Sequence, residues 1–170
     1  MSKYKNIVLF GFMGTGKSCV GKAVAERLGL DFIDMDDVVV ERAGKSIPEI
    51  FADDGEESFR AFERQIVEDL SQQSGHVIAT GGGVIKNSDN LRDYSRSGLV
   101  ICLSATPEVI LERVKSDTNR PLLNTADKMG EILSLLESRQ ELYNSVENQI
   151  DTSDLSVDEI VDRITAMWNG

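Results

Sequence analysis

The segment at residues 11–18, GFMGTGKS, has the residue types and spacing of a loop that binds phosphate groups. Its glycines let the backbone curl so that successive N–H groups point inward, toward phosphate oxygens. Lys17 can reach the terminal phosphates of a nucleotide, and the Ser18 hydroxyl group suits Mg²⁺. A glycine turn without a ligand is the alternative. We favour phosphate binding because the segment stands between a predicted strand and a predicted helix.

Two carboxylates come at the end of the second predicted strand, in the sequence FIDMDD. If the chain is still extended there, Asp34 and Asp36 lie on one face and Met35 lies on the other. They would project beside the crevice where open α/β sheets bind ligands. One carboxylate could hold Mg²⁺ through water, while the other accepts a proton from an attacking hydroxyl group. A solvated acidic turn is the alternative, and the phosphate loop in the same sheet argues against it.

Three consecutive glycines, Gly81, Gly82 and Gly83, follow another short apolar run in the sequence VIATGGGV. Glycine loses more conformational entropy on folding than any other residue, so three in a row need a reason. We expect them at the carboxyl end of a strand, in the same crevice as the phosphate loop. There, bare backbone would let a substrate ring approach and would turn N–H groups toward it. A flexible hinge is the alternative.

Three arginines are candidates for binding anionic groups. Arg60 lies in EESFRAFER and Arg139 in LLESRQELY, and an arginine among glutamates is ordinarily half of a surface ion pair. An acidic protein that binds a carboxylate nevertheless needs the planar donors that these two residues offer. Arg120 lies in an irregular segment at residues 115–128, which is suited to closing over a nucleotide. There it could meet the charge on a transferring phosphoryl group, or it could merely pair with a nearby aspartate.

The elements that must position these residues are short apolar runs alternating with helical patterns. Strands are predicted at residues 6–10, 31–34, 76–79, 99–103 and, more weakly, 148–151. The runs are nearly continuous in apolar character, which is typical of strands covered on both faces. The sequence therefore predicts a three-layer α/β fold with a parallel sheet. Helix ends are indicated by Gly29 as a C-cap, by Thr106 with Pro107, and by the capping pairs Ser46 with Glu49 and Ser156 with Glu159.

Length and composition narrow the class of protein. The chain has 170 residues, so we expect a single domain over residues 1–170, and we expect a monomer. Its formal charge of −11 argues against a nucleic-acid partner. Cys19 and Cys102 match no paired motif, and His76 is the only histidine, which excludes a multi-histidine metal site. Reduced cysteines favour a cytoplasmic setting, and no apolar run predicts a membrane span or a signal peptide.

The motifs GFMGTGKS, FIDMDD, GEESFR, ATGGG, NRPLL and ESRQELY occur together in the order and approximate spacing of shikimate kinases. The chain resembles that family over essentially its whole length. The resemblance implies a P-loop kinase of the nucleoside-monophosphate-kinase type, with a five-stranded parallel sheet and a mobile lid at about residues 115–128. It also implies transfer of the γ-phosphate of ATP, with Mg²⁺, to the 3-hydroxyl group of shikimate in the aromatic amino-acid pathway.

The resemblance also implies roles for the acceptor side of the site. Asp36 matches the aspartate that contacts the shikimate hydroxyl groups and is the proposed base. Arg60 and Arg139 match the arginines that hold the carboxylate, and Gly81, Gly82 and Gly83 match the glycines against the ring. Arg120 matches the lid arginine, which would act in catalysis together with Asp36 and Lys17.

On the nucleotide side, the resemblance implies contacts from Gly14, Thr15, Gly16, Lys17, Ser18, Cys19, Arg113 and Arg120. Asp34 and Ser18 match the residues near Mg²⁺. By a looser alignment, Arg113 and residues 151–153 resemble the part of the family that lies beside adenine. The family commonly has threonine at the position of Cys19, which we expect to affect helix packing rather than chemistry.

Other functions were weighed against the sequence. A kinase for another polyhydroxylated acid, such as gluconate, would share the phosphate loop but should not need the aspartates, the three glycines and two carboxylate arginines together. A nucleoside-monophosphate kinase is disfavoured because the irregular segment holds only Arg120. A GTPase switch would call for an N-K-x-D motif, which the sequence lacks. A non-catalytic relative would be expected to have lost Lys17 or an aspartate, and these are present.

Overall fold

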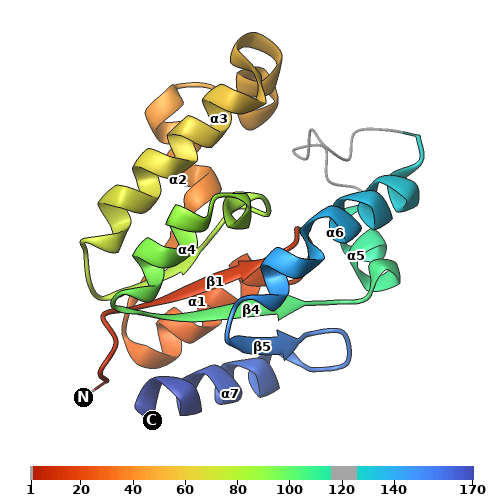
Figure 1. Ribbon diagram of the computed structural model, residues 1–170. Coiled ribbons are helices and arrows are strands. Elements are labelled where there is room, and N and C mark those ends of the chain that lie inside the picture. The colour runs from red at the N-terminus through yellow and green to blue at the C-terminus, as the bar shows by residue number, and fades with distance from the viewer. Residues whose placement is uncertain (1, 116–125) are drawn as a thin grey trace.

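The computed structural model describes residues 2–115 and 126–170, and its strands and helices alternate along the chain (Figure 1). The strands are β1 (Asn6–Gly11), β2 (Asp31–Asp34), β3 (His76–Ala79), β4 (Gly98–Ser104) and β5 (Asn148–Asp151). The helices are α1 (Lys17–Leu28), α2 (Met35–Ala43), α3 (Ile47–Ser71), α4 (Ser88–Ser95), α5 (Pro107–Val114), α6 (Lys128–Asn144) and α7 (Val157–Asn169), and the 3-10 turn η1 covers Val84–Lys86. The five predicted strands are confirmed to within one residue at each end.

The strands form one sheet in the order β2-β3-β1-β4-β5, and all neighbouring strands are parallel. β1 lies at the centre, where Ile7 is paired with Val77 on one side and with Leu99 on the other. Parallel neighbours cannot be joined by tight turns, so the strands are joined by helical crossover connections that run over a face of the sheet. The predicted five-stranded parallel sheet is therefore confirmed, including the weakly predicted β5 at its edge.

Alternate residues of β1 feed two separate cores, as expected for a strand covered on both faces. Ile7 and Leu9 pack with apolar residues of α1 and α7. Val8 and Phe10 pack with those of α2 through α6. Figure 1 shows α1 and α7 on one side of the sheet and α3 and α4 on the other. The three-layer α/β prediction is confirmed.

The helices begin and end where their capping residues predict. Gly29 adopts a left-handed conformation, with φ of 67°, at the end of α1. The Thr106 side chain caps α5, with Pro107 as the first helical residue. Ser46 caps α3, and Ser156 and Glu159 form a complete capping box at the start of α7. No helix in the described part of the chain is both long and apolar enough to cross a membrane.

The two ends of the expected lid lie together. Lys115 follows α5, Lys128 begins α6, and the Lys128 Nζ atom donates a hydrogen bond to the Lys115 carbonyl oxygen at 2.8 Å. The two described ends of the segment are thus in contact. Arg120 and most of the expected lid lie outside the described residues.

Candidate active site

The phosphate loop connects β1 to α1 through glycines whose conformations other residues rarely adopt. Gly11, Gly14 and Gly16 have φ angles of 149°, 77° and 101°. A Cβ atom on Gly11 would also overlap the carbonyl oxygen of Leu103, in the adjacent strand β4. Because the strain lies in the backbone itself, the glycines predicted from the motif are required by the geometry of the loop.

Polar side chains of the loop brace it from within. The Lys17 Nζ atom donates to the carbonyl oxygens of Gly11 and Phe12 at 2.7 and 2.9 Å. The Thr15 hydroxyl group, which is fully buried, donates to the Phe12 oxygen at 2.7 Å. Lys17 is also the first residue of α1, so its ammonium group and the positive end of the helix are adjacent. The loop therefore has the fixed positive charge and the curled backbone of an anion site.

Asp34 connects the phosphate loop to the second strand. Its Oδ2 atom accepts a hydrogen bond from the Ser18 hydroxyl group at 2.7 Å, and its Oδ1 atom accepts one from the backbone N–H group of Asp36 at 2.9 Å. The second bond makes Asp34 the N-cap of α2, which begins at Met35. The condition that the chain is still extended at Asp36 is therefore not met, because α2 begins at Met35, directly after the Asp34 cap.

Asp34 and Asp36 nevertheless line the same cleft as the phosphate loop. The volume of this cleft is about 150 Å³. It is lined by Gly14, Gly16, Lys17, Ser18, Cys19, Asp34, Asp36, Thr80, Gly81 and Gly82. The carboxyl ends of β1, β2 and β3 converge here, as they do in other open α/β sheets. The fold thus brings together the loop, both aspartates and two of the three glycines.

The glycine segment (residues 81–83) is packed against charged side chains of the protein itself. A Cβ atom on Gly83 would overlap the guanidinium group of Arg60. One on Gly81 would lie 2.7 Å from Glu63 Oε2 and 3.2 Å from Asp36 Oδ1. At Gly81 and Gly83 the space that a side chain would need is therefore occupied by the protein's own carboxylates and arginine. None of the three glycines has a positive φ.

Arg139 is buried, with only 2% of its surface exposed, so it is not half of a surface ion pair. Its Nη1 atom donates to the Gly82 carbonyl oxygen at 3.2 Å, and its guanidinium carbon lies 5.7 Å from the centre of the Phe12 ring. The Tyr143 hydroxyl group donates to the same Gly82 oxygen. Helix α6 thereby joins the glycine segment to the phosphate loop.

Tyr143 was missed from the sequence, although ESRQELY places it four residues after Arg139, on the same face of a helix. Burial raises the pKa of Tyr143 to about 12, against the influence of Arg139. The phenol therefore stays protonated at neutral pH and remains a hydrogen-bond donor.

Glu63 is a second buried residue beside the cleft that was not predicted from the sequence. Only 2% of it is exposed, and its Oε1 atom accepts a hydrogen bond from Arg60 Nη1 at 2.6 Å. Burial raises the pKa of Glu63 to about 7, Arg60 opposes that shift, and the charge of Asp36 adds to it. The spacing of Arg60 and Glu63 suggests an exposed helical pair, but the structure buries the pair beside Asp36.

Arg113 lies on the opposite side of the phosphate loop. It donates to the Gly14 carbonyl oxygen at 3.0 Å and to the Thr152 carbonyl oxygen at 3.3 Å. The Thr152 hydroxyl group lies 2.8 Å from the Thr15 oxygen and 2.9 Å from the Ser104 oxygen. The segment after β5 is thus fastened to the loop, as the looser alignment suggests, while contact of Arg113 with adenine stays a prediction. Thr152 lies in the predicted segment 151–153, and its hydrogen bonds to the loop are what the structure adds.

Cys19 does not take part in helix packing. It is exposed in the first turn of α1 and lines the cleft, whereas Val20 and Val24 form the buried face of that helix. The expectation that Cys19 affects packing is therefore wrong, because the second residue after Lys17 points away from the core.

Comparison with known proteins gives one consistent result. The family model "Shikimate kinase" matches residues 13–169. Curated shikimate kinases from Thermodesulfovibrio yellowstonii and Caldanaerobacter subterraneus subsp. tengcongensis are 44% and 46% identical over 94% of this chain, covering 92% and 94% of their own lengths. A solved shikimate kinase from Acinetobacter baumannii, in complex with shikimate, superimposes with a TM-score of 0.93 at 34% identity, covering 98% of this chain and 93% of that chain. With its phosphate loop and paired aspartates in one cleft, and with two arginines against the glycine segment, this chain belongs to the shikimate kinase family.

Proposed function

We propose that this protein transfers the γ-phosphate of ATP to the 3-hydroxyl group of shikimate, giving shikimate 3-phosphate and ADP. The observation that carries the proposal is the cleft in which the phosphate loop faces Asp36 and the glycine segment. The family relationship supplies the identity of the acceptor, because geometry alone would suit other small polyhydroxylated acids.

The phosphate loop would hold the nucleotide. Its curled backbone and the N-terminus of α1 bind the phosphates, and Lys17 follows the charge on the γ-phosphate during transfer. The Lys17 Nζ atom is held against the Gly11 and Phe12 carbonyl oxygens, and the residue lines the cleft where the phosphates would bind. Gly14, Thr15, Gly16, Ser18, Cys19 and Arg113 would complete the nucleotide side, and Arg120 would approach from the lid.

The residues beside the loop fit Mg²⁺. Ser18 Oγ and Asp34 Oδ2 are hard oxygen ligands that lie 2.7 Å apart at the edge of the cleft. Within residues 2–115 and 126–170, no three His, Cys, Asp or Glu residues are grouped so that they could hold a metal ion by themselves. Mg²⁺ commonly takes one or two protein ligands and completes its coordination with water and substrate phosphates. When bound, it would neutralise charge on the β- and γ-phosphates.

The acceptor would bind on the other side of the cleft. Arg139 contacts Gly82 and Arg60 lies against Gly83, so both guanidinium groups meet at the same short stretch of backbone. Such a pair of planar donors suits a carboxylate, which would hold the ring of the acceptor over the glycine segment. Asp36, which lines the cleft next to Gly81, would orient the acceptor hydroxyl group and finally take its proton.

A substrate panel tests this function. Purified protein with Mg²⁺ and ATP should release ADP when shikimate is added, measured by a coupled assay, and should give only the background rate with gluconate. ADP release with gluconate and not with shikimate would show that the acceptor has been assigned wrongly. Loss of the shikimate-dependent rate on chelation of Mg²⁺ would support the metal assignment.

We also propose that residues 1–170 form one domain, which acts as a monomer in the cytoplasm. One sheet recruits helices from the whole described chain to both of its faces. In the described part of the chain, the exposed large apolar residues are Val40, Leu133, Leu142 and Val157, which are spread over three helices. Cys19 and Cys102 are both free thiols, as expected where thiols stay reduced. Light scattering coupled to size-exclusion chromatography would test the monomer.

A further inference from the structure

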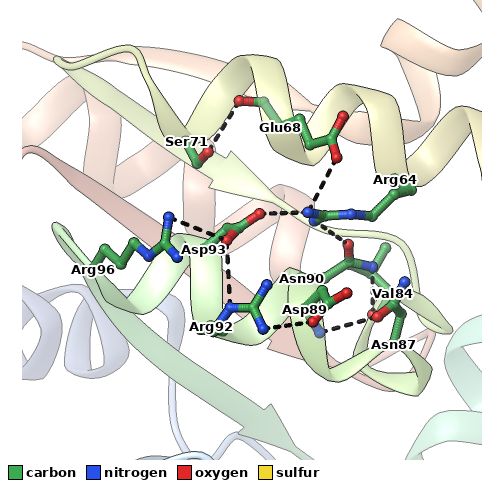
Figure 2. Close-up of polar contacts among 10 residues, drawn as sticks. All are labelled: Arg64, Glu68, Ser71, Val84, Asn87, Asp89, Asn90, Arg92, Asp93 and Arg96. Atoms are coloured by element: carbon green, nitrogen blue, oxygen red, sulfur yellow. Dashed lines mark hydrogen bonds and ion pairs between the residues drawn. The ribbon is translucent and has the colours of Figure 1, made fainter.

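A polar network joins α3 to the turn that follows the glycine segment (Figure 2). The guanidinium group of Arg64 donates from Nη1 to Asn90 Oδ1 at 3.0 Å and from Nη2 to Asp93 Oδ2 at 2.6 Å. Its Nη2 atom also lies 3.2 Å from Glu68 Oε1 on the same helix. Arg64 therefore uses both arms of its planar group to hold α4 against α3.

Asn90 extends this contact to the backbone beside the active site. Its side chain is buried, and its Nδ2 atom donates to the Val84 carbonyl oxygen at 3.0 Å. Val84 directly follows Gly83, and its own N–H group donates to the Gly81 oxygen at 3.2 Å. Two hydrogen bonds therefore connect Arg64 to the end of the glycine segment.

The same helix holds the glycine segment at a second point. Arg60 lies one helical turn before Arg64, and its guanidinium group occupies the space where Gly83 would carry a Cβ atom. The glycine segment is thus connected to α3 in two ways: directly, through Arg60 at Gly83, and through α4, where Asn90 contacts Arg64. If the glycine segment moves relative to α3, the place where Arg60 can lie must change with it.

Arg64 is better protected from solvent than the other arginines around Asp93. The side chains of Arg64 and Asp93 are 23% and 11% exposed, whereas those of Arg92 and Arg96 are 58% and 66% exposed. Arg92 and Arg96 approach the other carboxylate oxygen at 3.8 and 3.7 Å. The hydrogen bond from Arg64 lowers the pKa of Asp93, so this contact stays charged at neutral pH.

We propose that Arg64, acting through Asn90, is a positioning residue for the acceptor: it fixes the glycine segment against α3 so that Arg60 points into the acceptor site. This inference rests on the proposed function, in which Arg60 holds the acceptor carboxylate. Neither Arg64 nor Asn90 touches the reacting groups. Their effect is expected on acceptor affinity, with nucleotide affinity left intact.

Calorimetric titration of Arg64→Ala with shikimate and with ADP tests the proposal. Loss of a hydrogen bond to a charged group should weaken shikimate binding about tenfold, while ADP affinity stays within about twofold of wild type. Asn90→Asp keeps an acceptor for Arg64 but loses the donor to Val84, so it should weaken shikimate binding similarly. The double variant Arg64→Ala/Asn90→Asp should bind shikimate no more weakly than the weaker-binding of the two single variants, because both residues act through one relay.

Arg42→Ala is the matched control, because it breaks a single 2.7 Å ion pair between α2 and Asp69 of α3 without touching α4. It should leave both affinities unchanged. Equal weakening of shikimate and ADP in Arg64→Ala would overturn the proposal, and so would unchanged shikimate affinity with a lowered melting temperature.

Hydrogen exchange gives a readout that does not depend on the acceptor. In Arg64→Ala, the amides of Val84 and Lys86, which bond to the Gly81 and Gly83 oxygens, should exchange faster, while those of the phosphate loop should not. Unchanged exchange at Val84 and Lys86 would also overturn the proposal. If the wild-type protein fails to bind shikimate while Arg64→Ala still shows faster exchange at Val84 and Lys86, the result counts against the proposed function alone.

Discussion

The two sides of the cleft are built in different ways. The nucleotide side is a contiguous loop whose shape comes from the positive φ angles of Gly11, Gly14 and Gly16. The proposed acceptor side is assembled from α2, α3, the glycine segment and α6, and its groups are charged side chains packed against one another. The nucleotide side thus depends on the conformation of one stretch of backbone, and the acceptor side depends on where side chains from several elements lie.

This difference predicts how each side fails. A contiguous loop depends on its own conformation and on strand β4 behind it, so distant changes should disturb it little. The acceptor side depends on contacts between residues far apart in the chain, so a small change in one element should displace several groups. Gly82 joins the two sides, because a Cβ atom there would lie 3.3 Å from the Met13 backbone nitrogen in the phosphate loop. Gly82→Val should therefore disturb both sites.

The largest effect is expected at the proposed base of the acceptor side. Asp36→Asn should lower kcat by about 10²- to 10⁴-fold, because the amide cannot take the proton of the acceptor hydroxyl group. ADP affinity measured by calorimetry should be retained, since Asp36 lies in α2 and not in the phosphate loop. Unaltered turnover would remove Asp36 as the base.

The next effect is a pH dependence of stability that belongs to the acceptor side. Glu63 has a pKa of about 7 in the folded protein and 4.5 as the reference value, so its contribution to stability is fully present below pH 4.5 and is lost as pH rises through 7. Glu63→Gln cannot ionise. Between about pH 5 and about pH 8, the free energy of unfolding of wild type should therefore fall relative to the variant by about 2–3 kcal/mol, measured by urea denaturation.

Glu56→Gln is the control for this measurement. Burial opposes the shift, but the charges of Lys86 and Arg60 lower the pKa of Glu56. Its contribution is therefore present above its ordinary pKa and is lost only as pH falls, so Glu56→Gln should show a flat difference from wild type over the same pH range. A flat difference for Glu63→Gln as well would mean that Glu63 ionises normally.

Arg139→Ala should separate the two sides by affinity. Removal of the buried guanidinium group that we propose holds the acceptor carboxylate should raise the KM for shikimate about tenfold to a hundredfold, with a much smaller change in the KM for ATP. Steady-state kinetics with each substrate varied in turn measures both values. A selective defect in ATP would place Arg139 on the nucleotide side.

The smallest expected effect comes from adding one methyl group on the acceptor side. Gly83 has φ of −103°, which alanine tolerates, so Gly83→Ala changes only the contact with Arg60. Displacement of that flexible guanidinium group should raise the KM for shikimate several-fold, by about 1 kcal/mol in binding. Gly11→Ala adds the same methyl group where it overlaps rigid backbone, so it should instead impair ATP binding. Equal effects of both variants on both substrates would remove the distinction between the two sides.

Much of the fold could be predicted from the sequence because its signals are local. The apolar runs mark the five strands, and caps such as Gly29 and Thr106 mark helix ends within a few residues of themselves. The boundary at Asp34 and Asp36 could not be predicted in the same way. Whether a strand continues or a helix begins there depends on where the Asp34 carboxylate lies, and that position also involves Ser18, in another element.

The sequence by itself determined the phosphate loop, the parallel sheet and the candidate residues of the cleft, because periodicity, glycine content and motif spacing are properties of neighbouring residues. Only the tertiary structure decided that Glu63 and Arg139 are buried and that Arg60 lies against Gly83, rather than forming solvated surface pairs, and that Tyr143 bonds to the glycine segment. Burial and partner choice across the sheet depend on which distant elements meet. The same helical spacing of Arg60 and Glu63 would fit an exposed pair on a helix that packs another way round.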